Sequence, residues 1–143
     1  MGIKNSRDFD LLTLGQLLLR LSPPDNERLS RGDTFVKQVG GAELNVAVGA
    51  ALLGLHTGVI SKLPAHDIGS FMKGKIRSFG VSDDFFMYDQ SSSARVGIYY
   101  YENGAYPRKP KVIYDRNNSS FFSLNIDEIP EEVYTASKCF HTT

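Results

Sequence analysis

The distribution of hydrophobic and polar positions in the first part of the chain predicts several short, buried strands. Residues 9–15 form a nearly continuous apolar run that ends in glycine, as is typical of a strand buried on both faces of a parallel sheet. A second apolar stretch, residues 17–21, leads into a loop with two adjacent prolines, which interrupt regular structure. A further strand is predicted at residues 34–39.

The first predicted helix covers residues 42–53, where nearly every side chain is apolar or small. Helices that are apolar on most of their faces are usually buried, so we expect this one to lie inside the protein. Gly54 follows it and suits the left-handed conformation of a helix C-terminal cap.

A second helix is predicted to begin after Asp67, which can cap its N-terminus. Its apolar residues recur with the spacing of one helical face; they are Ile68, Phe71, Met72, Ile76 and Phe79. Strands are predicted on either side of this helix, at residues 57–63 and around residues 85–88. Because a strand–helix–strand unit is the building block of a parallel sheet, the predicted fold class is α/β.

The pattern changes in the last third of the chain, where a β-hairpin is predicted. Its two strands are residues 95–101 and 111–115, and a turn-rich segment with a basic tip joins them. A short helix is predicted at residues 127–136 and a final strand at residues 138–142. A parallel strand needs neighbouring strands and helices to cover it, so we expect the chain to be the N-terminal part of a larger sheet.

Composition and charge exclude several classes of protein. The chain has 143 residues, of which 41% are hydrophobic, and its 16 basic residues balance 16 acidic ones. This composition indicates one globular domain without a global field for nucleic acid or an anionic membrane, so neither partner is predicted. Cys139 is the only cysteine; we expect it to be buried in the last strand and the chain to be cytoplasmic. The three histidines lack the spacing of metal ligands, and no metal site is predicted.

The residues with chemical potential gather around a glycine pair at the start of the first predicted helix. Gly40 and Gly41 permit a sharp turn and the close approach of a ligand to the backbone. Asn45, in the first turn, offers a donor and an acceptor to a hydroxyl, and the helix N-terminus adds free N–H groups. The same spacing also describes a plain glycine turn before a core helix. It is not a phosphate loop of the GxxxxGK[ST] type, because the lysine and the following hydroxyl residue are missing.

This segment resembles the first signature of the PfkB/ribokinase family, GG-x-x-x-N-x-A, in which the helix contacts the sugar. Other family features follow in the same order, including Leu53-Gly54 before a strand and Gly80-Val81 after a helix. The resemblance extends from about residue 9 to residue 142. It implies a ribokinase-like fold, in which a parallel sheet flanked by helices carries a small β-strand lid. The implied lid strands are residues 17–21, 34–39, 95–101 and 111–115.

Within the family, several segments resemble 2-keto-3-deoxygluconate kinases, although Gln16 stands where those proteins usually have glutamate. By that resemblance Tyr99, Tyr114 and Arg116 contact a sugar acid. A guanidinium can form two hydrogen bonds with a carboxylate, whereas tyrosines on strands usually serve in packing and an arginine after a strand is usually exposed to solvent. The predicted substrate-binding residues are therefore Gly40, Gly41, Asn45, Tyr99, Tyr114 and Arg116.

The resemblance also implies a reaction. Members of the family transfer the γ-phosphoryl group of ATP to a primary hydroxyl of a sugar, with the help of Mg²⁺. Their catalytic aspartate and anion hole lie in a later motif, D-T-x-G-A-G-D, which this chain does not contain. No catalytic residue is therefore predicted here, and the ATP and Mg²⁺ sites are expected mainly in a C-terminal part that is absent from the chain.

The expected substrate of the intact parent is 2-keto-3-deoxygluconate, and the chain alone is expected to be inactive. Other readings stay open: another kinase of the family, such as a fructokinase or a 5-dehydro-2-deoxygluconokinase, a non-catalytic sugar-binding or dimerisation module, or a truncated product without function. Because lid strands in this family often form dimers, the resemblance also implies a homodimer or a higher oligomer.

Overall fold

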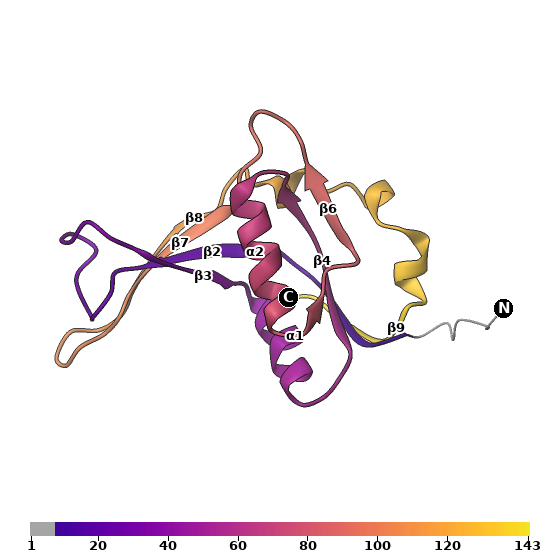
Figure 1. Ribbon diagram of the computed structural model, residues 1–143, viewed down its shortest axis with the longest axis horizontal. Coiled ribbons are helices and arrows are strands. Elements are labelled where there is room, and N and C mark those ends of the chain that lie inside the picture. Colours follow the sequence, from indigo (N-terminus) through magenta and orange to yellow (C-terminus); the bar gives the residue numbers. More distant parts are fainter. Residues whose placement is uncertain (1–7) are drawn as a thin grey trace.

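Residues 8–143 of the computed structural model form two β-sheets of different kinds (Figure 1). The larger sheet is parallel, with the strand order β5-β4-β1-β9 and with β6 also paired to β4. The smaller, four-stranded sheet has the order β3-β2-β7-β8 and projects from the body of the protein as an arm. The predicted α/β class with a parallel sheet is confirmed.

Four of the five strands of the parallel sheet were predicted, each to within one residue at both ends, whereas the short strand at Val81–Ser82 was not. The members of the sheet are nearly all apolar at central positions because helices or turns cover both faces. They are β1 (Phe9–Leu14), β4 (Thr57–Pro64), β5 (Val81–Ser82), β6 (Phe86–Asp89) and β9 (Ser137–His141).

Helices α1 (Ala42–Leu52) and α2 (Asp67–Ser78) cover one face of the parallel sheet (Figure 1). Leu44 of α1 and Met72 of α2 meet Val59 of β4 in the main hydrophobic core. Burial of such side chains is the dominant favourable contribution to folding. Neither of these helices, nor any other in the described part of the chain, is long and apolar enough to cross a membrane.

The opposite face of the sheet is covered by short 3₁₀ turns, which are η1 (Ser120–Ser123), η2 (Ile126–Glu128) and η3 (Glu131–Tyr134). Val133 packs there against Leu12 in a second core. The single helix predicted over residues 127–136 is therefore wrong. Pro130 separates η2 from η3, because proline has no N–H to continue a helix and clashes with the preceding turn.

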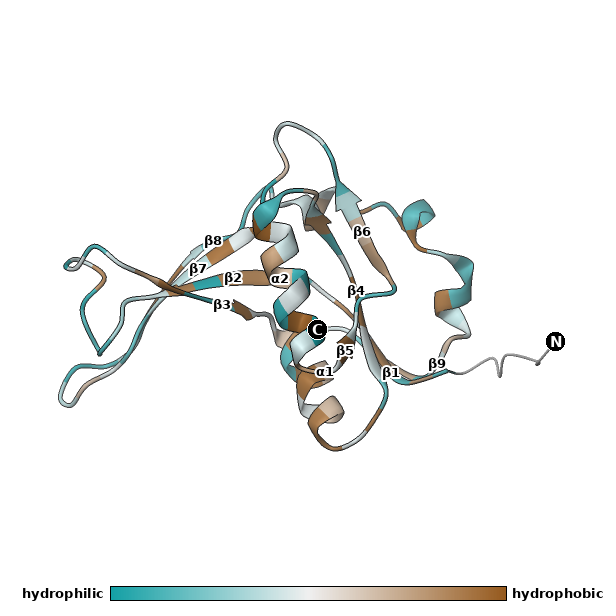
Figure 2. Ribbon diagram, viewed as in Figure 1, coloured by the Kyte–Doolittle hydropathy of each residue, from teal (hydrophilic) through white to brown (hydrophobic). Residues whose placement is uncertain are grey.

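Helix α1 is only partly buried, contrary to the prediction from its apolar composition. Leu44 and Ala47 face the core, whereas Leu52 and the following Leu53 are 78% and 84% exposed. Figure 2 shows hydrophobic residues in the last turn of α1, at the end that leads away from the sheet. Because the apolar side chains of this helix project from nearly all of its faces, its composition could not indicate which face would be covered.

Two further local predictions are wrong. Cys139 is exposed, because neither hydrophobic core extends over β9, whose three central residues are all exposed at the edge of the sheet. The N-cap of α2 is His66, whose Nδ1 accepts a hydrogen bond from the backbone N–H of Ile68 at 3.3 Å. Asp67 is instead the first helical residue, where its negative charge is favourable near the N-terminal end of the helix dipole.

The arm is built around β2 and β7, which pair in parallel, and the antiparallel strands β3 and β8 flank them. Each of these strands begins no more than two residues later than its predicted segment. Their bounds are β2 (Leu18–Ser22), β3 (Val36–Gly40), β7 (Gly97–Glu102) and β8 (Lys111–Asp115).

Candidate functional site

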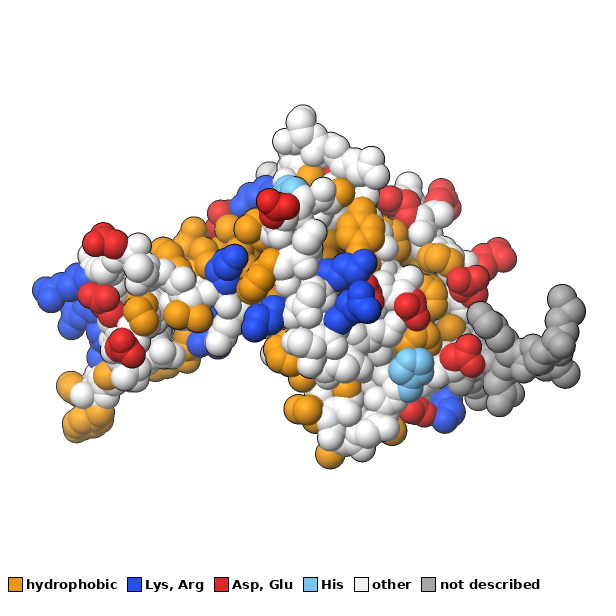
Figure 3. Space-filling model, in the orientation of Figure 1, with side chains coloured by type: hydrophobic (Ala, Val, Ile, Leu, Met, Phe, Trp, Pro, Cys, Tyr) orange, Lys and Arg blue, Asp and Glu red, His pale blue; other side chains and the backbone are white. Residues whose placement is uncertain are grey.

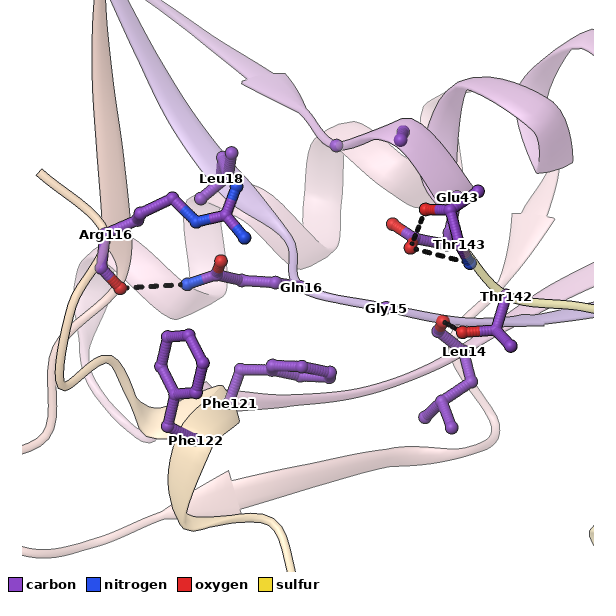
Figure 4. A pocket seen from close by; sticks show the side chains of 12 residues that line it. Leu14, Gly15, Gln16, Leu18, Glu43, Arg116, Phe121, Phe122, Thr142 and Thr143 are labelled. Carbon is purple, nitrogen blue, oxygen red and sulfur yellow. Dashed lines mark hydrogen bonds between the residues drawn. The ribbon is translucent and has the colours of Figure 1, made fainter. Parts of the chain in front are cut away.

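A cavity of about 290 Å³ lies where the parallel sheet meets the arm (Figure 4). Its walls come from the segment between β1 and β2, the start of α1, the residue after β8, the η1 turn, and the residues that follow β9. The carboxyl ends of β1 and β9 therefore open into it. Ligands of open parallel sheets bind beyond the carboxyl ends of the strands, and this volume suits a small ligand.

Gln16 ties the arm to the body on one side of the cavity. Its Nε2 donates hydrogen bonds to the Ser119 hydroxyl at 2.7 Å and to the Arg116 carbonyl at 3.1 Å. The side chain is only 8% exposed, and its Oε1 has no hydrogen-bond partner among residues 8–143. Gly97 leaves room for this arrangement, because a Cβ there would lie 2.7 Å from Gln16 Nε2. Gln16 thus fixes the backbone of Arg116 beside the cavity.

Arg116 is exposed and contributes its side chain to the cavity wall. Its guanidinium lies over the ring of Tyr114, 6.0 Å from the ring centroid, and the Tyr114 ring lies 6.0 Å from that of Tyr99 on the neighbouring strand. No carboxylate within the described range forms an ion pair with Arg116. Its charge is therefore available to an anionic ligand.

The two glycines make close contacts on either side: Gly40 with Tyr99 of the arm and Gly41 with the Gln16 backbone. A Cβ on Gly40 would lie 2.5 Å from the Tyr99 hydroxyl, so the absence of a side chain admits the phenol. Burial raises the pKa of Tyr99, against a smaller opposite effect from the nearby Arg20, so the phenol remains a hydrogen-bond donor at neutral pH. Gly41 has φ +139° and approaches the Gln16 carbonyl so closely that a Cβ would lie 2.8 Å from its oxygen.

Only two of the six predicted substrate-binding residues, Gly41 and Arg116, line the cavity. Asn45 is exposed on α1, where its backbone N–H donates to the Gly41 carbonyl at 2.9 Å, and its side chain is not part of the cavity wall. The remaining residues form a row along the arm, next to the cavity: Gly40, Tyr99 and Tyr114.

Comparison with known proteins decides the family. A family model described as pfkB family carbohydrate kinase matches residues 8–141, which is nearly the whole chain. The chain belongs to the PfkB carbohydrate kinases. The predicted family is thereby confirmed. Gly41 of the glycine pair and Arg116 line the same cavity.

Three relatives of this PfkB chain are named as kinases of dehydro-deoxy sugar acids. It is 35% identical to the 2-dehydro-3-deoxygalactonokinase of Haloferax volcanii, over 94% of this chain and 41% of the relative. It is 32% identical to the 5-dehydro-2-deoxygluconokinase 1 of Bacillus cereus, over 94% and 40%. The crystal structure of the 2-dehydro-3-deoxygluconokinase of Thermotoga maritima matches with a TM-score of 0.86 and 36% identity, over 93% and 40%. The chain thus spans about 40% of the length of these relatives.

Glu43 is a cavity residue of the PfkB chain to which the sequence analysis gave no role. It lies in the first turn of α1 and is 8% exposed. Its Oε1 accepts hydrogen bonds from the Thr143 hydroxyl at 2.6 Å and from the Thr143 backbone N–H at 3.3 Å. Gly15 provides the space, because a Cβ there would collide with the carboxyl group of Glu43. The available signal was a lone charged residue inside an otherwise apolar helical segment.

Two aromatic residues of η1 were also missed. Phe121 and Phe122 line the cavity with ring planes inclined by 72°, and Phe122 is 59% exposed. The turn that carries them is held by Ser120, whose hydroxyl donates to Asp89 Oδ2 at 2.8 Å and accepts the Arg95 backbone N–H at 3.2 Å. Adjacent phenylalanines between serines in a predicted loop are the signal that could have marked this apolar wall.

The anchor of this turn should depend on pH. The Ser91 backbone N–H, which donates to Asp89 Oδ1 at 3.0 Å, is the main cause that lowers the pKa of Asp89, with further help from the Ser91 and Ser120 side chains. A carboxylate whose folded pKa is depressed stabilises the fold above its unfolded pKa of about 3.9 and loses this contribution as pH falls through the folded pKa.

We therefore expect Asp89→Asn to lower the unfolding free energy at neutral pH and to flatten its decline below about pH 4. Urea unfolding at pH 7 and at pH 3 measures both effects. Asp127→Asn provides the matched control, because the exposed Asp127 carboxylate makes no hydrogen bond within residues 8–143. An equal loss of stability at the two pH values would contradict this role of Asp89.

Proposed function

We propose that this chain forms the sugar-binding part of an ATP-dependent carbohydrate kinase whose substrate is 2-keto-3-deoxygluconate, also called 2-dehydro-3-deoxygluconate, or a close relative. The observation that carries the proposal is the guanidinium of Arg116, which forms no ion pair within residues 8–143 and lines a cavity together with Gly41. Gln16 holds the backbone carbonyl of Arg116 beside that cavity. The names of two of its relatives, a 2-dehydro-3-deoxygalactonokinase and a 2-dehydro-3-deoxygluconokinase, support the same class of substrate.

The charges at the cavity favour a sugar acid over a neutral sugar. A guanidinium can form two parallel hydrogen bonds with a carboxylate, and a neutral sugar such as fructose would leave Arg116 without an anionic partner. The apolar rings of Phe121 and Phe122 suit the methylene group of a deoxy sugar, because each buried methylene contributes about 0.8 kcal/mol. The relatives include kinases named for 2-dehydro-3-deoxygluconate and for 5-dehydro-2-deoxygluconate, so the proposed class of substrate contains both acids.

The residues that the structure describes, 8–143, do not fit a Mg²⁺ site. No group of three or more His, Cys, Asp or Glu side chains gathers within residues 8–143 in a way that could hold a metal ion. The sequence also lacks the D-T-x-G-A-G-D motif. We therefore assign ATP, Mg²⁺ and the catalytic base to a further part of the intact kinase, and to this chain the binding and orientation of the sugar.

The arm is proposed to act as a lid over the cavity and as the contact between two copies of the chain. Hydrophobic side chains are exposed along it (Figure 3), and large exposed apolar patches usually mark interaction sites. Sedimentation equilibrium tests this, and a chain that stays monomeric at high micromolar concentration would contradict it. The exposed hydrophobic residues of the arm include Phe35, Val36, Val112 and Ile113, at 47%, 48%, 42% and 44%.

A reducing location such as the cytoplasm fits the single, unpaired Cys139.

Two measurements test the proposed function. Calorimetry should detect binding of 2-keto-3-deoxygluconate to this chain, with weaker or no binding of fructose, because only the acid pairs with Arg116. A coupled assay should detect ATP-dependent phosphorylation of the same acid by the intact protein and none by this chain. Turnover by the chain alone would contradict the placement of the catalytic base elsewhere. Sugar binding by an intact protein that never phosphorylates a sugar would favour a non-catalytic sugar-binding module.

A further inference from the structure

The cavity carries opposite charges on two sides. Arg116 lies on one side and Glu43 on the other, with the segment through Gly15 and Gln16 between them (Figure 4). Neither side chain belongs to any ion pair formed within residues 8–143. Both charges are therefore free to act on a ligand, and a ligand with one charged end would experience the two sides differently.

The Glu43 carboxylate is held in a defined position. Its side chain is 92% buried by the fold around it, since only 8% is exposed. Thr143 donates two hydrogen bonds to Oε1, whereas Oε2 accepts none from the described residues. The first turn of α1 adds the positive end of a helix dipole, which favours a negative charge at this place. A buried acceptor with a free oxygen therefore faces the cavity, since Glu43 lines it.

We propose that Glu43 sets the direction in which a sugar acid binds and excludes a second negative charge from the far end of the cavity. This inference rests on the proposed function. The acid group of the ligand pairs with Arg116, and its hydroxylated tail extends toward Glu43, whose Oε2 accepts a hydrogen bond from a neutral hydroxyl. A carboxylate or a phosphate at the tail would meet a like charge and could donate no hydrogen bond.

The consequence is a preference for sugar acids with a single charge. Diacids of the same length should bind more weakly than the monoacid. The same repulsion acts on the product of phosphorylation at the tail hydroxyl, because the new phosphate carries about −1.5 to −2 charges at neutral pH. Glu43 would thus weaken product binding relative to substrate binding, which favours product release.

The test compares three ligands by calorimetry on the 143-residue chain: 2-keto-3-deoxygluconate, the corresponding diacid with a second carboxylate at C6, and the 6-phosphate. The wild-type chain should bind the monoacid most tightly. Glu43→Gln, which keeps a carbonyl oxygen for Thr143, should reduce the preference over the diacid and over the phosphate by about tenfold or more. The readout is the ratio of affinities, not any single affinity.

Two further variants separate charge from shape. Glu43→Asp keeps the negative charge and should retain most of the preference, whereas the exposed Glu131→Gln should leave it unchanged. If Glu43→Gln binds all three ligands with the wild-type ratios, or if Glu43→Asp loses the preference as completely as Glu43→Gln, the proposal is wrong while the sugar-binding function stands. If neither the wild type nor Glu43→Gln binds the monoacid, the proposed function fails and the proposal fails with it.

Discussion

Arg116→Met should weaken the binding of 2-keto-3-deoxygluconate to this chain by about 50-fold or more, or ~2–3 kcal/mol. Methionine preserves most of the length and the apolar stem of the side chain but removes the charged donors that pair with a carboxylate. The Gln16 hydrogen bond is retained, because Gln16 donates to the backbone carbonyl of Arg116 and not to its side chain. The fold around the cavity should therefore persist.

Calorimetry with the acid and with fructose measures this effect directly. Arg31→Met is the matched control, because Arg31 is exposed far along the arm, outside the cavity wall, and its loss should leave the affinity for the acid within about twofold. A loss of less than threefold on Arg116→Met would show that the guanidinium does not hold the acid group. Equal losses for the acid and for fructose would point to a general disturbance of the cavity.

The second large effect is expected from Gly41→Ala, which should lower the unfolding free energy by about 2–4 kcal/mol and abolish measurable sugar binding. Gly41 has φ +139°, a conformation that residues with a side chain rarely adopt, and its new Cβ would lie 2.8 Å from the Gln16 carbonyl oxygen. Relief of this contact requires the start of α1 and the segment through Gln16 to move apart. Both segments contribute to the cavity wall.

Gly49→Ala offers a control within the same helix. A Cβ at Gly49 would have no neighbour within 4 Å, so alanine should raise the unfolding free energy by up to about 1 kcal/mol through its higher helix propensity. Urea unfolding of both variants, with calorimetry at the same protein concentration, measures the contrast. If Gly41→Ala were as stable as Gly49→Ala, the close approach of α1 to Gln16 would have no energetic importance.

The local pattern of the sequence was sufficient for most of the secondary structure. Four of the five strands of the parallel sheet lie within one residue of their predicted positions, because a buried strand is an apolar run of characteristic length bounded by glycine and polar residues. The two-residue strand β5 is too short to give such a pattern and was not predicted. Helix α2 was predicted because its apolar residues recur with the spacing of one helical face. The family signature pointed to Gly41, and the resemblance to 2-keto-3-deoxygluconate kinases pointed to Arg116; both residues line the cavity. The substrate-binding roles of all six predicted residues remain predictions.

Tertiary packing decided what the local pattern leaves open. Apolar residues occur all around α1, so the sequence does not indicate which face is buried. Only the position of the sheet determines that Ala47 is buried and that Leu53, just after the helix, is exposed. The cavity depends on long-range contacts: Gln16 bonds to Arg116 and Glu43 bonds to Thr143, each across 100 residues of chain. Sequence by itself determined the elements because their periods are local properties of the chain. The charged faces of the cavity appear only when folding brings these distant segments together, since no local rule relates residues that meet through the topology of the sheet.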